Sequence, residues 1–216
     1  MIVVALAGLA RGGKTTTATL LANWCMEHGL SPTIMSFAEP MKVAAKRLGL
    51  DKETNPSLYR ATLQRWGETR RDPNFRPSGH PGRRSGEDYW LRRVAILILQ
   101  KQLAERDKYA ALALINKEKE FCEKVLIFDD LRYLNELEFI RCIGGTTVFV
   151  DGRSRIKDID AAFRQHESEA LATYYTDGLM PDNAIDFLIT NDGSVTVLKN
   201  LVNRLAPVWL DMSVMS

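Results

Sequence analysis

The chain has 216 residues, a formal net charge of +2, 45% hydrophobic residues and 26% charged residues. This composition fits one globular α/β domain with its own core, and the near-neutral charge argues against a protein that coats nucleic acid. The cysteines are three, widely spaced and without a C-x-x-C pair, which excludes a disulfide framework and a cysteine zinc site. The first apolar run lacks the basic segment of a signal peptide, and the later apolar run at residues 94–99 is too short to cross a bilayer. We expect a soluble cytoplasmic protein without a membrane partner.

The first predicted strand, residues 2–7, leads into a loop with the spacing G-x-x-x-x-G-K-[ST]. Residues 15–27 then carry apolar side chains at helical spacing, and the pattern ends at His28-Gly29. In a strand–loop–helix of this kind, successive backbone N–H groups and the helix N-terminus face one anion. We therefore interpret the loop as a P-loop that wraps the β-phosphate of ATP, with Lys14 bridging the β- and γ-phosphates and Thr15 offering its hydroxyl to Mg²⁺. The candidate ATP-binding residues of this loop are Gly8, Arg11, Gly12, Gly13, Lys14, Thr15 and Thr16.

The next part of the chain predicts a strand at residues 32–37 and helices at 41–48 and 58–66. Residues 67–88 are rich in glycine and proline, which predicts an irregular, mobile loop. Nine arginines stand between Arg60 and Arg93 against few acidic residues. They have two readings, a solvated basic face or a site for an anionic substrate whose phosphate is held by guanidinium groups.

A further helical pattern covers residues 89–103 and continues towards residue 124, with a break expected near Asp107. The buried strand predicted at residues 125–128 ends in Asp129-Asp130. Behind a P-loop, an aspartate at such a strand end lies beside the phosphates and can position Mg²⁺. We assign that role to Asp130; for Asp129 the alternative is a cap of the following helix.

The remaining pattern is a helix at 131–143, a strand at 146–150, a polar irregular stretch at 151–181, a strand at 186–190, and a helix at 195–205 after a turn. Alternation of strands and helices predicts a parallel sheet with helices on both faces. We expect a P-loop NTPase three-layer sandwich of about five strands, formed as one domain over residues 1–216. In such sheets ligands bind at the carboxyl ends of the strands, where the P-loop, Asp130, Arg153 and Asn191 all fall.

Six segments in chain order resemble the P-loop nucleoside monophosphate kinase superfamily, and most closely the bacteriophage deoxynucleoside monophosphate kinases. They cover nearly the whole chain, and together they are specific although each is modest. These segments are Gly8–Thr16, Phe37–Lys42, Leu63–Thr69 (L-Q-x-x-G-T with Glu68 inserted), Asp130–Arg132 with Glu136 beyond it, His166–Ala170, and Ile189–Ser194.

The resemblance implies transfer of the ATP γ-phosphoryl group to a deoxynucleoside monophosphate with Mg²⁺ as cofactor. It also implies an acceptor-binding insertion at about 51–90 and a lid at about 151–181, both mobile. Lys14, Asp130 and Arg132 are the expected catalytic residues, and Arg132 stabilises the charge of the transition state. The lid arginines Arg153 and Arg155 close over ATP, Asn191 and Gly193 border the adenine, and His166 has a structural role. The expected acceptor site consists of Phe37, Lys42, Gln64, Trp66, Arg70, Arg71 and Arg132.

Two other functions compete with this interpretation. Animal phosphomevalonate kinases share the W-G-E at Trp66 and a D-x-R, and residues 76–88 depart from the phage family, so the acceptor stays open between the two. A partition-type P-loop ATPase is disfavoured, because Leu9 stands where such proteins carry a signature lysine. We expect small-molecule nucleotides as partners and no nucleic acid, and a homodimer is compatible with the sequence.

Overall fold

The structure is a computed structural model that describes residues 1–72, 74, 86, 88–114, 122–153, 170–180 and 184–211. The described chain packs as two compact units, residues 1–36 with 122–216 and residues 37–121. The insertion expected at residues 51–90 falls within the second unit, and its acceptor-binding role stays a prediction. Arg155, His166 and residues 76–85 lie outside the described residues. None of the helices in the described part of the chain is long and apolar enough to cross a bilayer.

The first unit is built on a five-stranded sheet in which every neighbouring pair is parallel. The strands lie in the order β2-β3-β1-β4-β5, so the strand that leads into the P-loop is at the centre. A central strand of a parallel sheet is covered on both faces, which explains the uninterrupted apolar run before the loop. The predicted fold class is confirmed. The strands are β1 (Ile2–Ala7), β2 (Ser31–Met35), β3 (Lys124–Leu131), β4 (Thr146–Asp151) and β5 (Phe187–Thr190).

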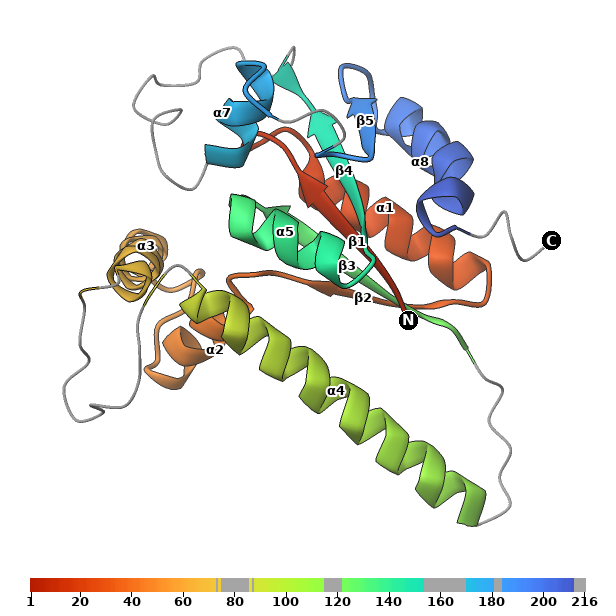
Figure 1. The fold of residues 1–216 in the computed structure, drawn as a ribbon, viewed down its shortest axis with the longest axis horizontal. Helices are drawn as coiled ribbons and strands as arrows, with labels where there is room; N and C mark the ends of the chain where they lie inside the picture. Colours follow the sequence, from red (N-terminus) through yellow and green to blue (C-terminus); the bar gives the residue numbers. More distant parts are fainter. Residues whose placement is uncertain are drawn as a thin grey trace. The chain divides into compact units, whose positions relative to one another are not determined.

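Helices cover both faces of this sheet (Figure 1). On one face α1 (Lys14–Glu27) and α8 (Val195–Trp209) pack against each other and bury alternate residues of the strands, among them Val4 and Ile127. On the opposite face α5 (Leu134–Cys142) packs against β4. On that face α7 (Ala170–Thr176) places Tyr175 in a stack on Phe149, with ring centroids 4.0 Å apart.

The second unit consists of helices α2 (Glu39–Arg47), α3 (Pro56–Arg71) and α4 (Tyr89–Leu114). The expectation that the chain becomes irregular at residue 67 is wrong, because α3 continues to Arg71 and ends only before Asp72-Pro73. The break expected near Asp107 is also wrong, since α4 runs through it. A single aspartate costs only a few tenths of a kcal/mol in a helix of strong formers, so the surrounding residues decide.

Three boundaries in the first unit also differ from the sequence pattern. Strand β3 continues through Leu131, so α5 begins three residues later than predicted. Helix α7 forms inside the stretch predicted to be irregular, where Leu171 is buried and Tyr175 stacks on the sheet. Helix α8 runs past Pro207 to Trp209, because burial of Ala206 and Trp209 offsets the backbone hydrogen bond that proline cannot make.

Candidate functional site

The loop between β1 and α1 adopts a conformation that few side chains tolerate. Gly8 has a φ of 136°, Gly13 a φ of 102°, and Arg11 a φ of 62°. The Gly12 N–H donates to the Leu9 carbonyl at 3.0 Å, which closes the turn. Gly13 is the N-cap of α1 and has no side chain with which to satisfy the first N–H groups of the helix. These N–H groups form the kind of site that binds a phosphate.

The loop packs directly on the backbone at the end of β4. A Cβ on Gly8 would lie 2.4 Å from the Val150 carbonyl oxygen, and a Cβ on Gly152 would lie 2.5 Å from the Gly12 carbonyl oxygen. Neither distance leaves room for a side chain. Glycine at positions 8 and 152 is therefore required by the close approach of two backbone segments.

Lys14 begins α1, and the residue is only 7% exposed. Its ammonium donates to the carbonyl oxygens of Gly8 at 2.7 Å and of Leu9 at 2.9 Å. The charge is thus held inside the loop, next to the N–H groups that would bind the anion. The role predicted for Lys14, bridging the β- and γ-phosphates, stays a prediction.

The two aspartates at the end of β3 have different partners. The Thr15 hydroxyl donates to Asp129 Oδ2 at 3.2 Å, whereas Ser36 donates a short hydrogen bond to Asp130. Asp129 continues the alternate positions Val125 and Ile127, whose side chains pack under α1. Asp129 is therefore the carboxylate beside the P-loop threonine, and it does not cap α5, whose N-cap is Tyr133. The sequence prediction that Asp130 holds the metal stays untested.

Both aspartates lie at an irregularity in the pairing of β3 with β1. Ala5 pairs with Phe128 and Ala7 with Leu131, so β3 has one more residue than β1 between these pairs. An extra residue of this kind is a β-bulge, which re-aims the side chains around it. The bulge comprises both aspartates, of which Asp129 contacts Thr15 and Asp130 contacts Ser36.

Hard oxygen ligands beside a phosphate site are those that Mg²⁺ prefers, and Mg²⁺ commonly takes only one or two protein ligands together with substrate phosphates. Thr15 and Asp129 fit this requirement. Within the described ranges, no group of three or more His, Cys, Asp or Glu side chains gathers as a cation site.

Arg132 follows the end of β3, the strand that pairs with β1. Its N–H donates to Glu136 Oε2 at 2.9 Å, and its carbonyl oxygen accepts from the Leu171 N–H at 3.0 Å. The buried Glu136 and the start of α7 thus hold the backbone at Arg132 from both sides. Glu136, which the sequence predicted only as an acidic residue further along, proves to have this backbone-holding position.

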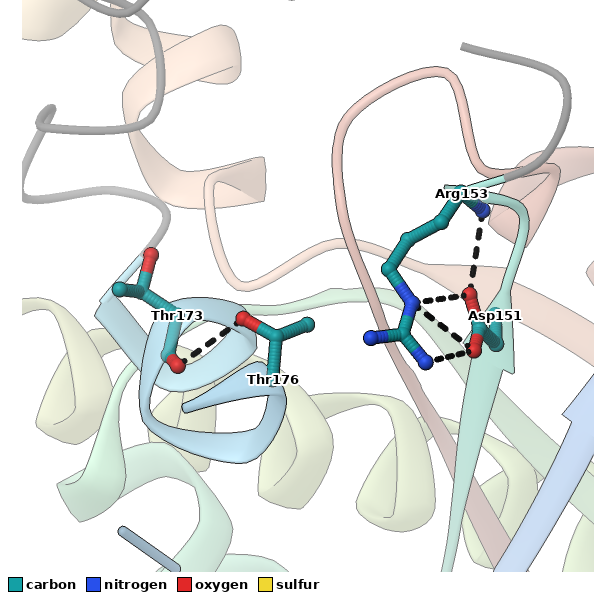
Figure 2. Close-up of polar contacts among 4 residues, drawn as sticks. All are labelled: Asp151, Arg153, Thr173 and Thr176. Carbon is teal, nitrogen blue, oxygen red and sulfur yellow. Dashed lines mark hydrogen bonds and ion pairs between the residues drawn. The ribbon is translucent and has the colours of Figure 1, made fainter. Parts of the chain in front are cut away.

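Arg153 and Asp151 form an ion pair at the end of β4 (Figure 2). The guanidinium donates from Nη2 to Asp151 Oδ2 at 2.6 Å and from Nε to both carboxylate oxygens, at 3.0 and 3.1 Å. The Arg153 N–H also donates to Asp151 Oδ1 at 3.1 Å. These hydrogen bonds from Arg153 lower the pKa of the Asp151 carboxyl. The lid role predicted for Arg153 concerns residues mostly outside the described chain, and it stays a prediction.

Asn191 and Gly193 lie after β5. The Asn191 side chain is buried and contacts the P-loop, where its Nδ2 donates to the Gly12 carbonyl oxygen at 2.9 Å. Gly193 lies in the turn before α8, and a Cβ there would lie 3.1 Å from Val197 Cβ. The adenine-bordering role expected for both residues stays a prediction.

A cavity of about 400 Å³ lies within the second unit, between α2, α3 and the beginning of α4. Of the predicted acceptor residues, Trp66 and Arg70 line this cavity, whereas the buried Phe37 and also Lys42, Gln64 and Arg71 do not. The guanidinium carbons of Arg70 and Arg93 lie 5.1 and 5.7 Å from the centre of the Tyr89 ring. The described lining contains no acidic residue; it includes Arg47, Trp66, Arg70, Tyr89, Trp90, Arg93 and Gln100.

The sequence reasoning missed Arg47 and Gln100 and did not single out Arg93. Arg93 entered only as one member of the arginine-rich span between Arg60 and Arg93. The cavity-lining residues of α4 share helical spacing, since Tyr89, Arg93, Leu97 and Gln100 recur every three or four residues. This stripe of α4 could have been identified as one face of a site.

The sequence matches no protein-family model and no curated protein. Among solved structures it is similar to the crystal structure of APE1195, at 15% identity over 96% of this chain and 95% of the other, with a TM-score of 0.40. It is similar to shikimate kinase from Aquifex aeolicus vf5, at 14% identity over 100% and 99%, with a TM-score of 0.42. Shikimate kinase from Acinetobacter baumannii in complex with shikimate gives 11% identity over 98% and 94%, with a TM-score of 0.41. Likenesses this weak define no activity, which has to be argued from the residues of this chain.

The Asp151–Arg153 pair predicts a pH dependence of stability. Because the folded-state pKa of Asp151 lies below its unfolded value of about 4, the pair stabilises the fold fully above that value and loses its effect as the pH falls through the folded pKa. Since the Arg153 side chain is 54% exposed, we expect Asp151→Asn to cost only about 0.5 kcal/mol at neutral pH. The difference from wild type should shrink below about pH 4. Urea unfolding at a series of pH values measures it.

Asp177→Asn is the matched control for the change of charge. Asp177 is exposed, and the structure describes no ion pair for its side chain. A difference between wild type and Asp151→Asn that grows on acidification would contradict the lowered pKa.

Proposed function

We propose that this chain is an ATP-dependent phosphotransferase that transfers the γ-phosphoryl group of ATP to a deoxynucleoside monophosphate, giving a deoxynucleoside diphosphate and ADP. One observation carries the donor half of the proposal. The buried ammonium of Lys14 lies inside the P-loop, and the Thr15 hydroxyl lies against Asp129 at the carboxyl edge of a parallel sheet. Cation, N–H groups and hard oxygen ligands are the components that a nucleoside triphosphate requires.

The reaction forms a bond between an oxygen of the acceptor phosphate and the γ-phosphorus, and it breaks the bond to the oxygen that bridges the β- and γ-phosphates. That bridging oxygen leaves with ADP. An acceptor phosphate is already nucleophilic at neutral pH, so the reaction needs positioning and charge neutralisation more than a general base. We assign none.

The chain's own residues divide these tasks. The P-loop N–H groups and Lys14 hold the triphosphate, and Arg132, which follows the strand next to β1, stabilises the charge that develops on the transferred group. Thr15 and Asp129 would hold Mg²⁺, with Asp130 as a further candidate for a metal-bound water. When bound, Mg²⁺ neutralises part of the triphosphate charge. Arg153 would break its ion pair with Asp151 and contact ATP instead.

The cavity of the second unit supports the acceptor half. Its volume falls within the usual range of small-molecule sites. Three arginines suit a phosphate, and the rings of Trp66, Tyr89 and Trp90 suit a planar base. The aromatic lining favours a nucleotide over phosphomevalonate, which has no ring to stack.

A screen of acceptors with ATP and Mg²⁺ tests the proposal. ADP formation should increase on addition of one or more of dTMP, dGMP, dCMP and dAMP, and chromatography should identify the corresponding diphosphate. Phosphomevalonate, shikimate and the ribonucleotides are the competing acceptors in the same assay. If only phosphomevalonate or shikimate is phosphorylated, the proposed acceptor is wrong and the proposed ATP site is retained. ATP hydrolysis that DNA stimulates and no monophosphate affects would contradict a kinase altogether.

The cavity assignment makes a separate kinetic prediction. Arg70→Ala should raise KM for the deoxynucleoside monophosphate about tenfold, because one charge-assisted contact to a phosphate is lost, while KM for ATP should not change. Lys46→Ala is the matched control, since Lys46 is exposed on α2 and does not line the cavity; it removes the same charge from the same unit. An increase of KM for ATP in Arg70→Ala would place Arg70 on the donor side instead.

A further inference from the structure

Asn191 is a buried polar residue at the edge of the sheet. It follows β5 directly, and the residue is only 2% exposed. Its backbone N–H donates to the Asp151 carbonyl oxygen at 2.7 Å, which continues the pairing of β5 with β4. The backbone of Asn191 is therefore held by the sheet itself, not by a mobile loop.

The side chain of Asn191 extends from this position to the P-loop. Its Nδ2 donates to the Gly12 carbonyl oxygen at 2.9 Å. A Cβ on Gly13 would lie 2.2 Å from the same nitrogen. The amide of Asn191 thus occupies the space that a side chain at position 13 would need, and it contacts both residues of the Gly12–Gly13 peptide unit.

This contact determines which way the peptide group faces. The Gly12–Gly13 bond is trans, so its carbonyl oxygen and its N–H point in opposite directions. A hydrogen bond that holds the Gly12 carbonyl towards Asn191 therefore directs the Gly13 N–H away from Asn191. Two consecutive glycines have no Cβ to resist rotation of the peptide between them, so the orientation has to be imposed from outside the loop.

We propose that Asn191 is a positioning residue that holds the Gly12–Gly13 peptide in the orientation in which the Gly13 N–H binds a phosphate of the donor. The inference rests on the proposed function only to the extent that the P-loop takes a polyphosphate. This role differs from the expectation that Asn191 borders the adenine. Here the side chain acts on the phosphate site, and its effect does not depend on the base of the nucleotide.

The experiment compares ATP with tripolyphosphate, which has the phosphates and no base. Asn191→Asp keeps the shape of the side chain and replaces the donor with a carboxylate oxygen, which the Gly12 carbonyl oxygen repels. Calorimetric titration in the presence of Mg²⁺ should show that this variant weakens both ligands by the same factor, about tenfold or more. The neighbouring Asp192→Asn, an exchange at an exposed position, should leave both affinities unchanged. The ratio of ATP to GTP affinity should stay at its wild-type value in every variant.

Three results would overturn the inference. Weaker binding of ATP with unchanged binding of tripolyphosphate would assign Asn191 to the base. A lower melting temperature with both affinities unchanged would make its role one of stability alone. If Asn191→Asp does not fold, Asn191→Ala is compared with wild type in the same titrations, because it removes the amide without adding a charge. Wild-type affinity of Asn191→Ala for both ligands would contradict the proposal. Because no acceptor is present, a protein that binds ATP but phosphorylates no monophosphate would refute the proposed function and leave this inference standing.

Discussion

The functional half of the molecule depends on the close approach of two backbone segments. The P-loop lies on the end of β4 with so little space that a Cβ at Gly8 or Gly152 would overlap a carbonyl oxygen. Protein interiors are close-packed and transmit such contacts rigidly. The loop therefore takes its shape from the sheet edge, and the edge brings Gly152 and Asn191 against the P-loop between β1 and α1.

Several buried polar side chains of the first unit hold backbone groups. Glu136 accepts the N–H groups of Arg132 and Tyr133, and Asn191 donates to Gly12. Preorganised groups of this kind cost no rearrangement when a ligand binds. The ion pair of Asp151 and Arg153 differs from them, because Arg153 is half exposed and such a pair is weak enough to exchange partners.

Much of this was predictable from the sequence, and the failures have physical causes. Apolar runs and the glycine–lysine spacing predicted the sheet, its direction and the P-loop, because burial and phosphate binding each impose a local pattern. Which aspartate contacts the Thr15 hydroxyl could not be decided locally, since it depends on which face of β3 lies under α1. Helix α7 was missed because stacking of Tyr175 on Phe149 stabilises it. The cavity combines residues from three helices, and only the stripe on α4 had a periodic signal.

Binding of ATP by the P-loop is the central claim, and calorimetric titration of the wild-type chain and of Lys14→Ala with ATP and Mg²⁺ tests it most directly. The account predicts one ATP bound per chain in the wild type. It predicts binding about tenfold to a hundredfold weaker in the variant, because a buried ammonium no longer contacts the phosphates, with an unchanged circular dichroism spectrum. A wild type that binds no ATP, or a folded variant with wild-type affinity, would contradict it.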